Sequence, residues 1–343
     1  MSSRSERRWR LWRDVVTSFR HDPLINWTQR LWGTLSSWFE EADRARPGRS
    51  AVRSLRFDHL ESRRLLSSDV GLTGFNAATG AWTVSRYDGT QYTVESAPSW
   101  TSSSNLQNVQ TVDLWGRGYS DLIGYDSSTG TWWGTWNVGT GITTAPIAGW
   151  AAGEDFQNIV TGDFNQDGRT DFAGWDPVRG QLVAATSMAS GFASQIVAVW
   201  SPTDKWEDIT AGDFNHDGYT DIIGFDATTG AWHMVAGSPT GLTNDQVIGQ
   251  WDPTQNWQDL TTGAFYHDGN TDILGYNATT GDWHTLAFNG SSFQDRIIGN
   301  WNPAENWQIA GVGDFWGIGQ GMLLGFDPAT GEWRGTWAIG SGT

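Results

Sequence analysis

The sequence predicts an all-β fold, and two features of its composition and one of its order lead to this prediction. The 343 residues include 43 Gly and 24 Trp, whereas only 17% of the residues are charged. Many glycines together with many large aromatic side chains are typical of short strands joined by tight turns. The third feature is an internal repeat that begins near residue 69.

Two short motifs recur along the chain at a nearly constant period. The first is a turn that recurs at spacings of 50, 50, 50, 51 and 50 residues, as NAATGAW (76–82), DSSTGTW (126–132), DPVRGQL (176–182), DATTGAW (226–232), NATTGDW (277–283) and DPATGEW (327–333). The second is a tryptophan pair, WSPTDKW (200–206), WDPTQNW (251–257) and WNPAENW (301–307), with weaker copies from Trp100 and Trp150. Such a period indicates copies of one supersecondary unit packed side by side.

Each repeat is interpreted as four short strands. One copy gives DITAGDF (208–214), DIIGFD (221–226), AWHMVAG (231–237) and DQVIGQW (245–251). Each segment is rich in apolar and aromatic residues and is bounded by turn residues. Four strands per unit, arranged around an axis, predict a β-propeller. Because one blade cannot bury both of its faces, neighbouring blades must cover them, with tryptophans filling the space between.

The number of blades is predicted by counting strands of each type. The second and third strands occur six times, whereas the first and fourth occur five times each. The count predicts six blades of which two are incomplete. Five blades with spare strands is the alternative.

Residues 1–68 differ from the propeller segment 69–343. The first segment holds 14 Arg against 8 acidic residues, and the remainder holds 7 basic against 30 acidic residues, so their formal charges are +6 and −23. Apolar spacing predicts amphipathic helices at 7–20 and 24–42, with a poorly ordered basic leader as the alternative. The acidic propeller segment argues against nucleic acid as a partner.

The cysteine content and the hydropathy pattern bear on disulfides, thiolate metal sites, membrane spans and a signal peptide. The chain has no Cys, which excludes disulfides and thiolate metal sites. No run of about 18 apolar residues predicts a transmembrane segment. The N-terminus has the positive charge of a secretory signal but lacks its apolar stretch, so no standard signal peptide is predicted. We expect the propeller to be a monomer.

Two acidic loops predict a metal site. Residues 162–176 read GDFNQDGRTDFAGWD, and residues 212–226 read GDFNHDGYTDIIGFD. Each loop places three aspartates and one asparagine within nine positions. Like charges about 4 Å apart repel by roughly 4 kcal/mol at an effective dielectric constant of about 20. A bound cation would remove this repulsion; the alternative is a set of Asx turns with acidic decoration.

The spacing favours calcium but not a complete EF-hand. Asp-x-Asn-x-Asp-Gly matches the first half of that loop, yet Gly174 and Gly224 stand where a bidentate Glu is required. Strands flank the loops in place of helices. Hard oxygen ligands at alternate positions, with a main-chain carbonyl at the seventh, suit Ca²⁺ better than Mg²⁺. The loops are therefore predicted to be calcium loops that close β-hairpins.

The Gly-Asp-Phe-Asn-x-Asp-Gly-x-x-Asp element, repeated in blades over about 69–343, resembles the FG-GAP or VCBS repeats of integrin-like propellers and many bacterial surface proteins. The resemblance implies two calcium sites, with ligands from Asp163, Asn165, Asp167, Arg169 (carbonyl) and Asp171, and from Asp213, Asn215, Asp217, Tyr219 (carbonyl) and Asp221. The other copies depart from the pattern. VDLWGRGYSD (112–121), GAFYHDGNTD (263–272) and GDFWGIGQGM (313–322) each lack some of the ligands, so no site is expected there.

A second, shorter resemblance lies at FDHLESRRLLS (57–67). It is similar to the Leu-Glu-Pro-Arg-x-Leu-Leu element near the N-termini of large bacterial surface proteins, with Ser62 in place of Pro. The resemblance implies an extracellular or cell-surface location. The alternative is a basic linker.

No catalytic constellation is predicted. His233 and His284 occupy equivalent places in adjacent repeats, and His216 and His267 share a loop position, so these histidines reflect the repeat and do not form one site. Glu207 and Asp208 are expected to be surface charges at a strand end. The sequence therefore predicts a non-catalytic binding or adhesion module, with a protein or glycan ligand at a propeller rim. A lectin that uses exposed Trp and a scaffold without a ligand are the alternatives.

Overall fold

The computed structural model describes residues 72–76, 81–87, 91–97, 100, 106–118, 120–137, 142–154, 156–188, 191–243, 245–266, 268–305, 307–315 and 320–337. These residues form strands, turns and loops, and no helix long and apolar enough to cross a membrane occurs among them. The chain divides into two compact units, Met1–Phe57 and Asp58–Thr343, and every described residue belongs to the second. The helices expected at 7–20 and 24–42, the motif at 57–67 and the boundary at residue 68 lie outside the described residues.

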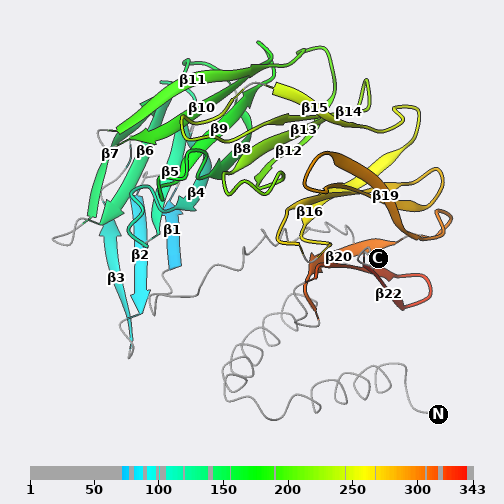
Figure 1. Cartoon of the computed structure of the whole chain (residues 1–343). Coiled ribbons are helices and arrows are strands. Elements are labelled where there is room, and N and C mark those ends of the chain that lie inside the picture. Colours follow the sequence, from blue (N-terminus) through cyan, green and yellow to red (C-terminus); the bar gives the residue numbers. More distant parts are fainter. Residues whose placement is uncertain are drawn as a thin grey trace, which may run out of the picture. The chain divides into compact units, whose positions relative to one another are not determined.

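The strands form six antiparallel sheets, each with its strands in sequence order (Figure 1). Two sheets have three strands: β1 (Leu72–Asn76), β2 (Ala81–Tyr87) and β3 (Tyr92–Ala97), and β20 (Gln308–Gly313), β21 (Met322–Asp327) and β22 (Glu332–Trp337). The other four sheets have four strands each. They are β4 (Leu106–Val112), β5 (Asp121–Asp126), β6 (Thr131–Asn137) and β7 (Ile142–Gly149); β8 (Gln157–Gly162), β9 (Asp171–Asp176), β10 (Gln181–Met188) and β11 (Gly191–Val199); β12 (Trp206–Gly212), β13 (Asp221–Asp226), β14 (Ala231–Val235) and β15 (Asp245–Gln250); and β16 (Trp257–Gly263), β17 (Asp272–Asn277), β18 (Asp282–Phe288) and β19 (Phe293–Asn300).

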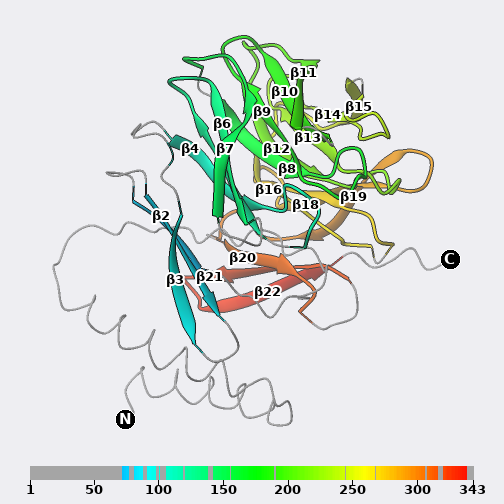
Figure 2. The same ribbon diagram turned by 90° about the vertical axis from the view of Figure 1, so that its left-hand side faces the viewer.

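The sheets are arranged like the blades of a propeller, as the repeat predicts. Most contacts between neighbouring blades join strands of the same rank, such as β8 with β12 and β7 with β11, whereas β19 contacts β22. Figure 2 shows the same succession of sheets from the side. The two incomplete blades are also as predicted: the first described sheet lacks a first strand, and the last described sheet lacks a fourth.

In the four complete blades, the core centres on the second strand. In β5, β9, β13 and β17 all six residues are buried. In the fourth strands β11, β15 and β19, buried and exposed residues do not alternate regularly. Exposed and half-buried residues predominate in all three. The second strands therefore carry the apolar layer that packs against the next blade.

A tryptophan that follows each fourth strand joins one blade to the next. Trp251 is 2% exposed, and its indole lies against Gly275 in the second strand of the following blade. A Cβ atom at Gly275 would lie 2.5 Å from the indole, so glycine is required there. The same pairing recurs for Trp100 with Gly124, Trp150 with Gly174, Trp200 with Gly224, and Trp301 with Gly325.

The recurring turn links the second and third strands to the end of the fourth. Gly230 has φ = +79°, a left-handed conformation that glycine adopts without steric cost. Its amide donates to the Asp226 carbonyl at 2.7 Å, and its carbonyl accepts from the Trp251 amide at 2.8 Å. The turn therefore sets the position of the tryptophan that reaches the next blade.

Candidate functional site

The predicted metal loops connect the first and second strands of consecutive blades, and hydrogen bonds link them into one rim. The Thr220 amide donates to the Asp163 carbonyl at 3.1 Å, and the Thr220 hydroxyl accepts from the Asp163 amide at 3.2 Å. Thr170 makes the same pair of contacts with Asp113, and the Thr271 amide donates to the Asp213 carbonyl at 3.0 Å. Each loop is thus held by the next loop, and the two candidate sites are neighbours.

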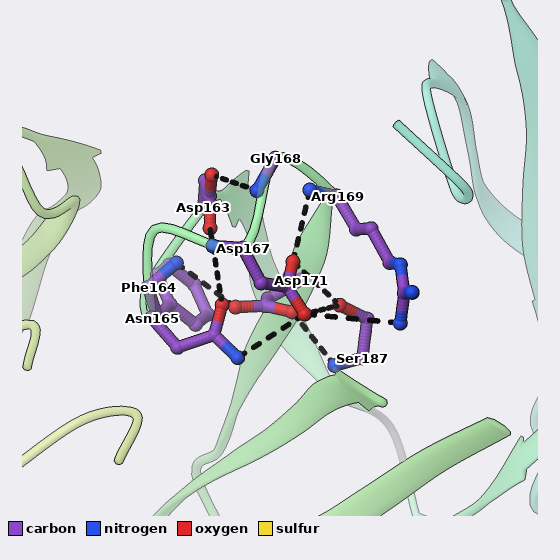
Figure 3. Close-up of polar contacts among 8 residues, drawn as sticks. All are labelled: Asp163, Phe164, Asn165, Asp167, Gly168, Arg169, Asp171 and Ser187. Carbon is purple, nitrogen blue, oxygen red and sulfur yellow. Dashed lines mark hydrogen bonds and ion pairs between the residues drawn. The ribbon is translucent and has the colours of Figure 1, made fainter. Parts of the chain in front are cut away.

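In the loop 163–171, Asp163 organises the backbone (Figure 3). Its two oxygens accept from the amides of Asp167 at 3.0 Å and Gly168 at 2.8 Å. The Asn165 side-chain oxygen accepts from the Asp167 amide at 3.1 Å. Asp167 in turn accepts from the Arg169 amide at 2.9 Å. Oxygen-bearing side chains at positions one, three and five of the loop therefore all point into it.

The loop 213–221 repeats this geometry residue by residue. Asp213 accepts from the amides of Asp217 at 3.1 Å and Gly218 at 3.0 Å. The Asn215 oxygen accepts from the Asp217 amide at 3.0 Å, and Asp217 accepts from the Tyr219 amide at 2.9 Å. The two predicted sites are structurally equivalent.

The aspartate at the ninth position is buried in both loops. Asp171 accepts from the amides of Phe164 at 2.9 Å and Ser187 at 2.7 Å, and is 0% exposed. Burial raises the pKa of Asp171 to about 6. Burial likewise raises the pKa of Asp221 to about 7, and the nearby carboxylates Asp217 and Asp213 contribute to the same direction. Both groups lie where a positive charge would be favourable.

The donor chemistry of these residues fits a hard cation, but the acids do not form a compact cluster. Among the described residues, no group of three His, Cys, Asp or Glu side chains is arranged to hold a metal ion. The carboxylates accept backbone N–H groups instead, which is the geometry of Asx turns. A carboxylate oxygen that accepts one of these hydrogen bonds keeps a second lone pair that could face a cation.

The basic partners of the two loops differ. The Arg169 guanidinium lies 3.9 Å from Asp167, and both side chains are partly exposed. In the described part of the chain, no basic side chain forms an ion pair with Asp213, Asp217 or Asp221. The negative charge of the second loop is therefore not neutralised by neighbouring side chains.

Two residues that contact the loops lie outside the loop motif and could not be predicted from it. Ser187, at the end of β10, donates its amide to Asp171, and its hydroxyl lies 3.3 Å from Asp167. Gly237 donates its amide to Asp221 at 2.9 Å. Both residues come from the third strand or the segment after it, about 16 residues beyond the aspartate. Only the pairing of strands within the blade brings them to the loop.

His233 and His284 lie outside these loops, whereas His216 is the fourth residue of the loop 213–221. His233 pairs with Asp245 at 2.8 Å, and its ring lies 5.0 Å from that of Trp206. His284 pairs with Asp295 at 3.1 Å and lies 5.0 Å from Trp257. Each pair stays within its own blade, as expected of repeat-equivalent residues. His216 is exposed, and His267 lies outside the described residues.

The tryptophan pairs pack between blades and do not form an open platform. Trp200 stacks on Trp206 at 4.2 Å, Trp251 stacks on Trp257 at 4.2 Å, and Trp301 lies 5.0 Å from Trp307. The first member of each pair is at most 2% exposed, and the second is partly buried. The packing role expected for these six residues is confirmed.

A polar depression lies beside the second loop. It has a volume of about 570 Å³ and opens between the loops 213–221 and 264–272. Side-chain amides of Asn215, Asn289 and Gln294 line it together with Asp268 and Arg296. The Arg296 guanidinium lies 5.4 Å above the ring of Tyr266. This depression offers donors, acceptors and an aromatic ring to a ligand.

Comparison with known proteins supports the fold. No protein-family model and no curated protein sequence matches the chain. A lectin of Agrocybe aegerita, described for specific recognition of non-reducing terminal N-acetylglucosamine, is 16% identical, covers 74% of this chain and 71% of its own, and has a TM-score of 0.54. At this identity the likeness shows the β-propeller fold and nothing more.

Two further solved structures are similar at lower scores. The WD40 domain of SCAP from fission yeast is 10% identical, covering 78% of this chain and 72% of its own, with a TM-score of 0.44. BBS1N, solved in complex with ARL6DN, is 12% identical, covering 78% and 75%, also with a TM-score of 0.44.

Proposed function

We propose that the chain is a non-catalytic binding module of the extracellular space or the bacterial cell surface, whose rim is stabilised by two calcium ions. The observation that carries the calcium proposal is the loop 213–221. It gathers three carboxylates around one turn, buries one of them completely, and has no basic partner for any of them among the described residues.

The residues that would hold the ions are those of the two complete loops. In each loop, the side chains at positions one, three, five and nine and the carbonyl at position seven would supply oxygen, the ligand that Ca²⁺ prefers. The ion would neutralise the carboxylates, and the Asx-turn hydrogen bonds would hold them in place. The likeness of the loops to FG-GAP or VCBS repeats supports this assignment.

Calcium should raise the thermal stability of the chain, and Asp213→Ala should remove one of two bound ions. At a free concentration 100-fold above Kd, each site contributes about 2.7 kcal/mol. Asp113→Ala is the matched control, because Asp113 accepts the same two backbone amides, at 2.9 and 2.6 Å, in a loop that lacks the middle ligands. Calorimetric titration of the chelated protein, with metal analysis, measures both variants. A stoichiometry that Asp213→Ala leaves unchanged would refute the assignment.

The calcium effect should also depend on pH in a defined direction. Because burial raises the pKa of Asp221 to about 7, its contribution to stability without metal is present at acidic pH and is lost as pH rises through that value. Calcium binds the ionised form. The gain in melting temperature on adding calcium should therefore be larger at pH 8 than at pH 6.

A second candidate function is glycan binding, and the polar depression favours it. Amide and carboxylate side chains beside an aromatic ring are suited to hydroxyl groups, whereas the tryptophan pairs are packed between blades. A glycan array probed with the intact protein, with calcium and with chelator, tests this candidate. Binding should weaken in Arg296→Ala but not in Arg334→Ala, whose guanidinium lies 4.9 Å over Trp307 elsewhere. Binding to no glycan would leave a protein ligand or a scaffold role.

The non-catalytic part of the proposal rests on the histidines. Each His–Asp pair belongs to one blade and packs against a tryptophan of the interblade layer. Glu207 and Asp208 are both exposed, as expected of surface charges. Hydrolysis of any member of a glycan panel by the purified chain would contradict this part. Surface location, which rests on the motif at 57–67, is tested by protease accessibility on intact cells.

A further inference from the structure

At its fourth and sixth positions, the loop 113–121 has the same backbone conformation as the two proposed calcium loops. At the fourth position, Gly116, Gln166 and His216 have φ values of +62°, +58° and +59°. At the sixth position, Gly118, Gly168 and Gly218 have φ values of +74°, +80° and +87°. Asp113 accepts from the amides at the fifth and sixth positions, as Asp163 and Asp213 do.

The buried aspartate at the ninth position is present in this loop as well. Asp121 is 2% exposed and accepts from the Leu114 amide at 3.1 Å. Phe164 and Phe214 make the same contact with Asp171 and Asp221. The three loops thus share these backbone hydrogen bonds and φ values. In each of them, the negative charge of one buried carboxylate has to be compensated.

The loops differ at the fifth position, where Asp167 and Asp217 are replaced by Arg117. One guanidinium nitrogen of Arg117 lies 3.1 and 3.3 Å from the two oxygens of Asp121. The aspartate side chain in this ion pair is 1% exposed, whereas that of Arg117 is 31% exposed. A cation therefore lies against the buried carboxylate, and it belongs to the protein.

We propose that the guanidinium of Arg117 is a built-in substitute for the divalent cation, so that the loop 113–121 keeps its fold without metal while the two loops that follow depend on it. The proposal rests on the proposed calcium sites. Its physical basis is that replacing an acid by a base at the fifth position changes the local charge by two units. The loop thereby loses a ligand and gains the counter-charge.

Because Arg117 stands at the fifth position, the loop 113–121 should stay ordered without metal and stabilise the neighbouring loop of the rim. The Thr170 amide donates to the Asp113 carbonyl at 2.9 Å, and Gly116 lies so close to the Gly168 carbonyl that a Cβ atom there would overlap it. The guanidinium-locked loop therefore supports the first calcium loop directly. When calcium is removed, loss of order should stop at this contact.

Hydrogen exchange of the unmodified chain tests the proposal without any variant. With chelator, amide exchange in 164–171 and 214–221 should become at least tenfold faster than with calcium, whereas exchange in 114–121 should stay within twofold. Faster exchange of similar size in all three segments would overturn the proposal. If no segment responds and no calcium is bound, the proposed calcium sites fail instead.

Arg117→Asp provides the complementary test. It restores an acid at the fifth position, and metal analysis should then find three ions per chain where the wild type binds two. Trp115 at the third position supplies no oxygen, so the new site should be the weakest of the three. Arg117→Lys keeps a positive charge and should still bind two ions. If Arg117→Asp also binds two while the wild type binds two, Arg117 is not a substitute for the ion. If Arg117→Asp does not fold, the exchange experiment alone decides.

Discussion

Gly230→Ala should destabilise the chain by about 2–5 kcal/mol. A side chain at φ = +79° costs about 1–2 kcal/mol, and overpacking adds about 1–3 kcal/mol. The overpacking arises because the new Cβ atom would overlap the carbonyl oxygen of Trp251 and lie 3.0 Å from Pro253. Backbone atoms cannot move aside as a flexible side chain does. Denaturant unfolding with and without calcium measures the loss.

The chain contains a matched control for this substitution. Gly331 occupies the same place in the last described turn and also has φ = +79°, but no atom of the described residues lies within 4 Å of its Cβ position. Gly331→Ala should therefore lose only the conformational part, about 1–2 kcal/mol. Equal losses in the two variants would show that contact with Trp251 and Pro253 contributes nothing.

Trp251→Ala should cost about 3–5 kcal/mol, the range for deleting a buried tryptophan. The indole is 2% exposed, stacks on Trp257 at 4.2 Å and donates to Asp295 at 3.1 Å. Because it also covers Gly275 of the following blade, its removal opens a cavity between two blades. Trp333→Ala is the control, since Trp333 is 59% exposed and its loss should be small.

A double substitution shows whether the cost arises at the contact between blades. Gly275→Ala alone should destabilise, because its Cβ atom would meet Trp251 at 2.5 Å and Leu260 at 2.7 Å. In the Trp251→Ala background the indole is gone, so the same change should cost less by about 0.5–3 kcal/mol. Strict additivity of the two losses would mean that the residues do not interact.

The architecture could be predicted from the sequence because its signals are local and repeated. DIIGFD is β13 without a change at either end, and the turn after it has glycine where a positive φ is required. The count of strand types predicts which sheets are incomplete. Each of these inferences uses residues that are close in sequence, and each is supported by several copies.

The details of the rim could not be predicted, because they depend on contacts between blades. The loop motif contains Thr170 and Thr220, but their bonds to the preceding loop join residues 57 positions apart. Likewise, the sequence shows only that Arg117 replaces a metal ligand. The ion pair between Arg117 and Asp121 depends on the folded loop. The motif identified the acids of the candidate sites; their hydrogen-bonded arrangement and their unequal neutralisation required the structure.

The tryptophan that follows each fourth strand has a consequence for how such a chain lengthens. Each four-stranded blade carries a tryptophan after its fourth strand and a glycine in its second strand, and this glycine contacts the tryptophan of the blade before it. A duplicated blade therefore already carries both the tryptophan and the glycine that form the contact between blades, and no new interface has to evolve. Unit number can change by simple copying, while the acids of each loop are free to diverge, as the arginine in one of them shows.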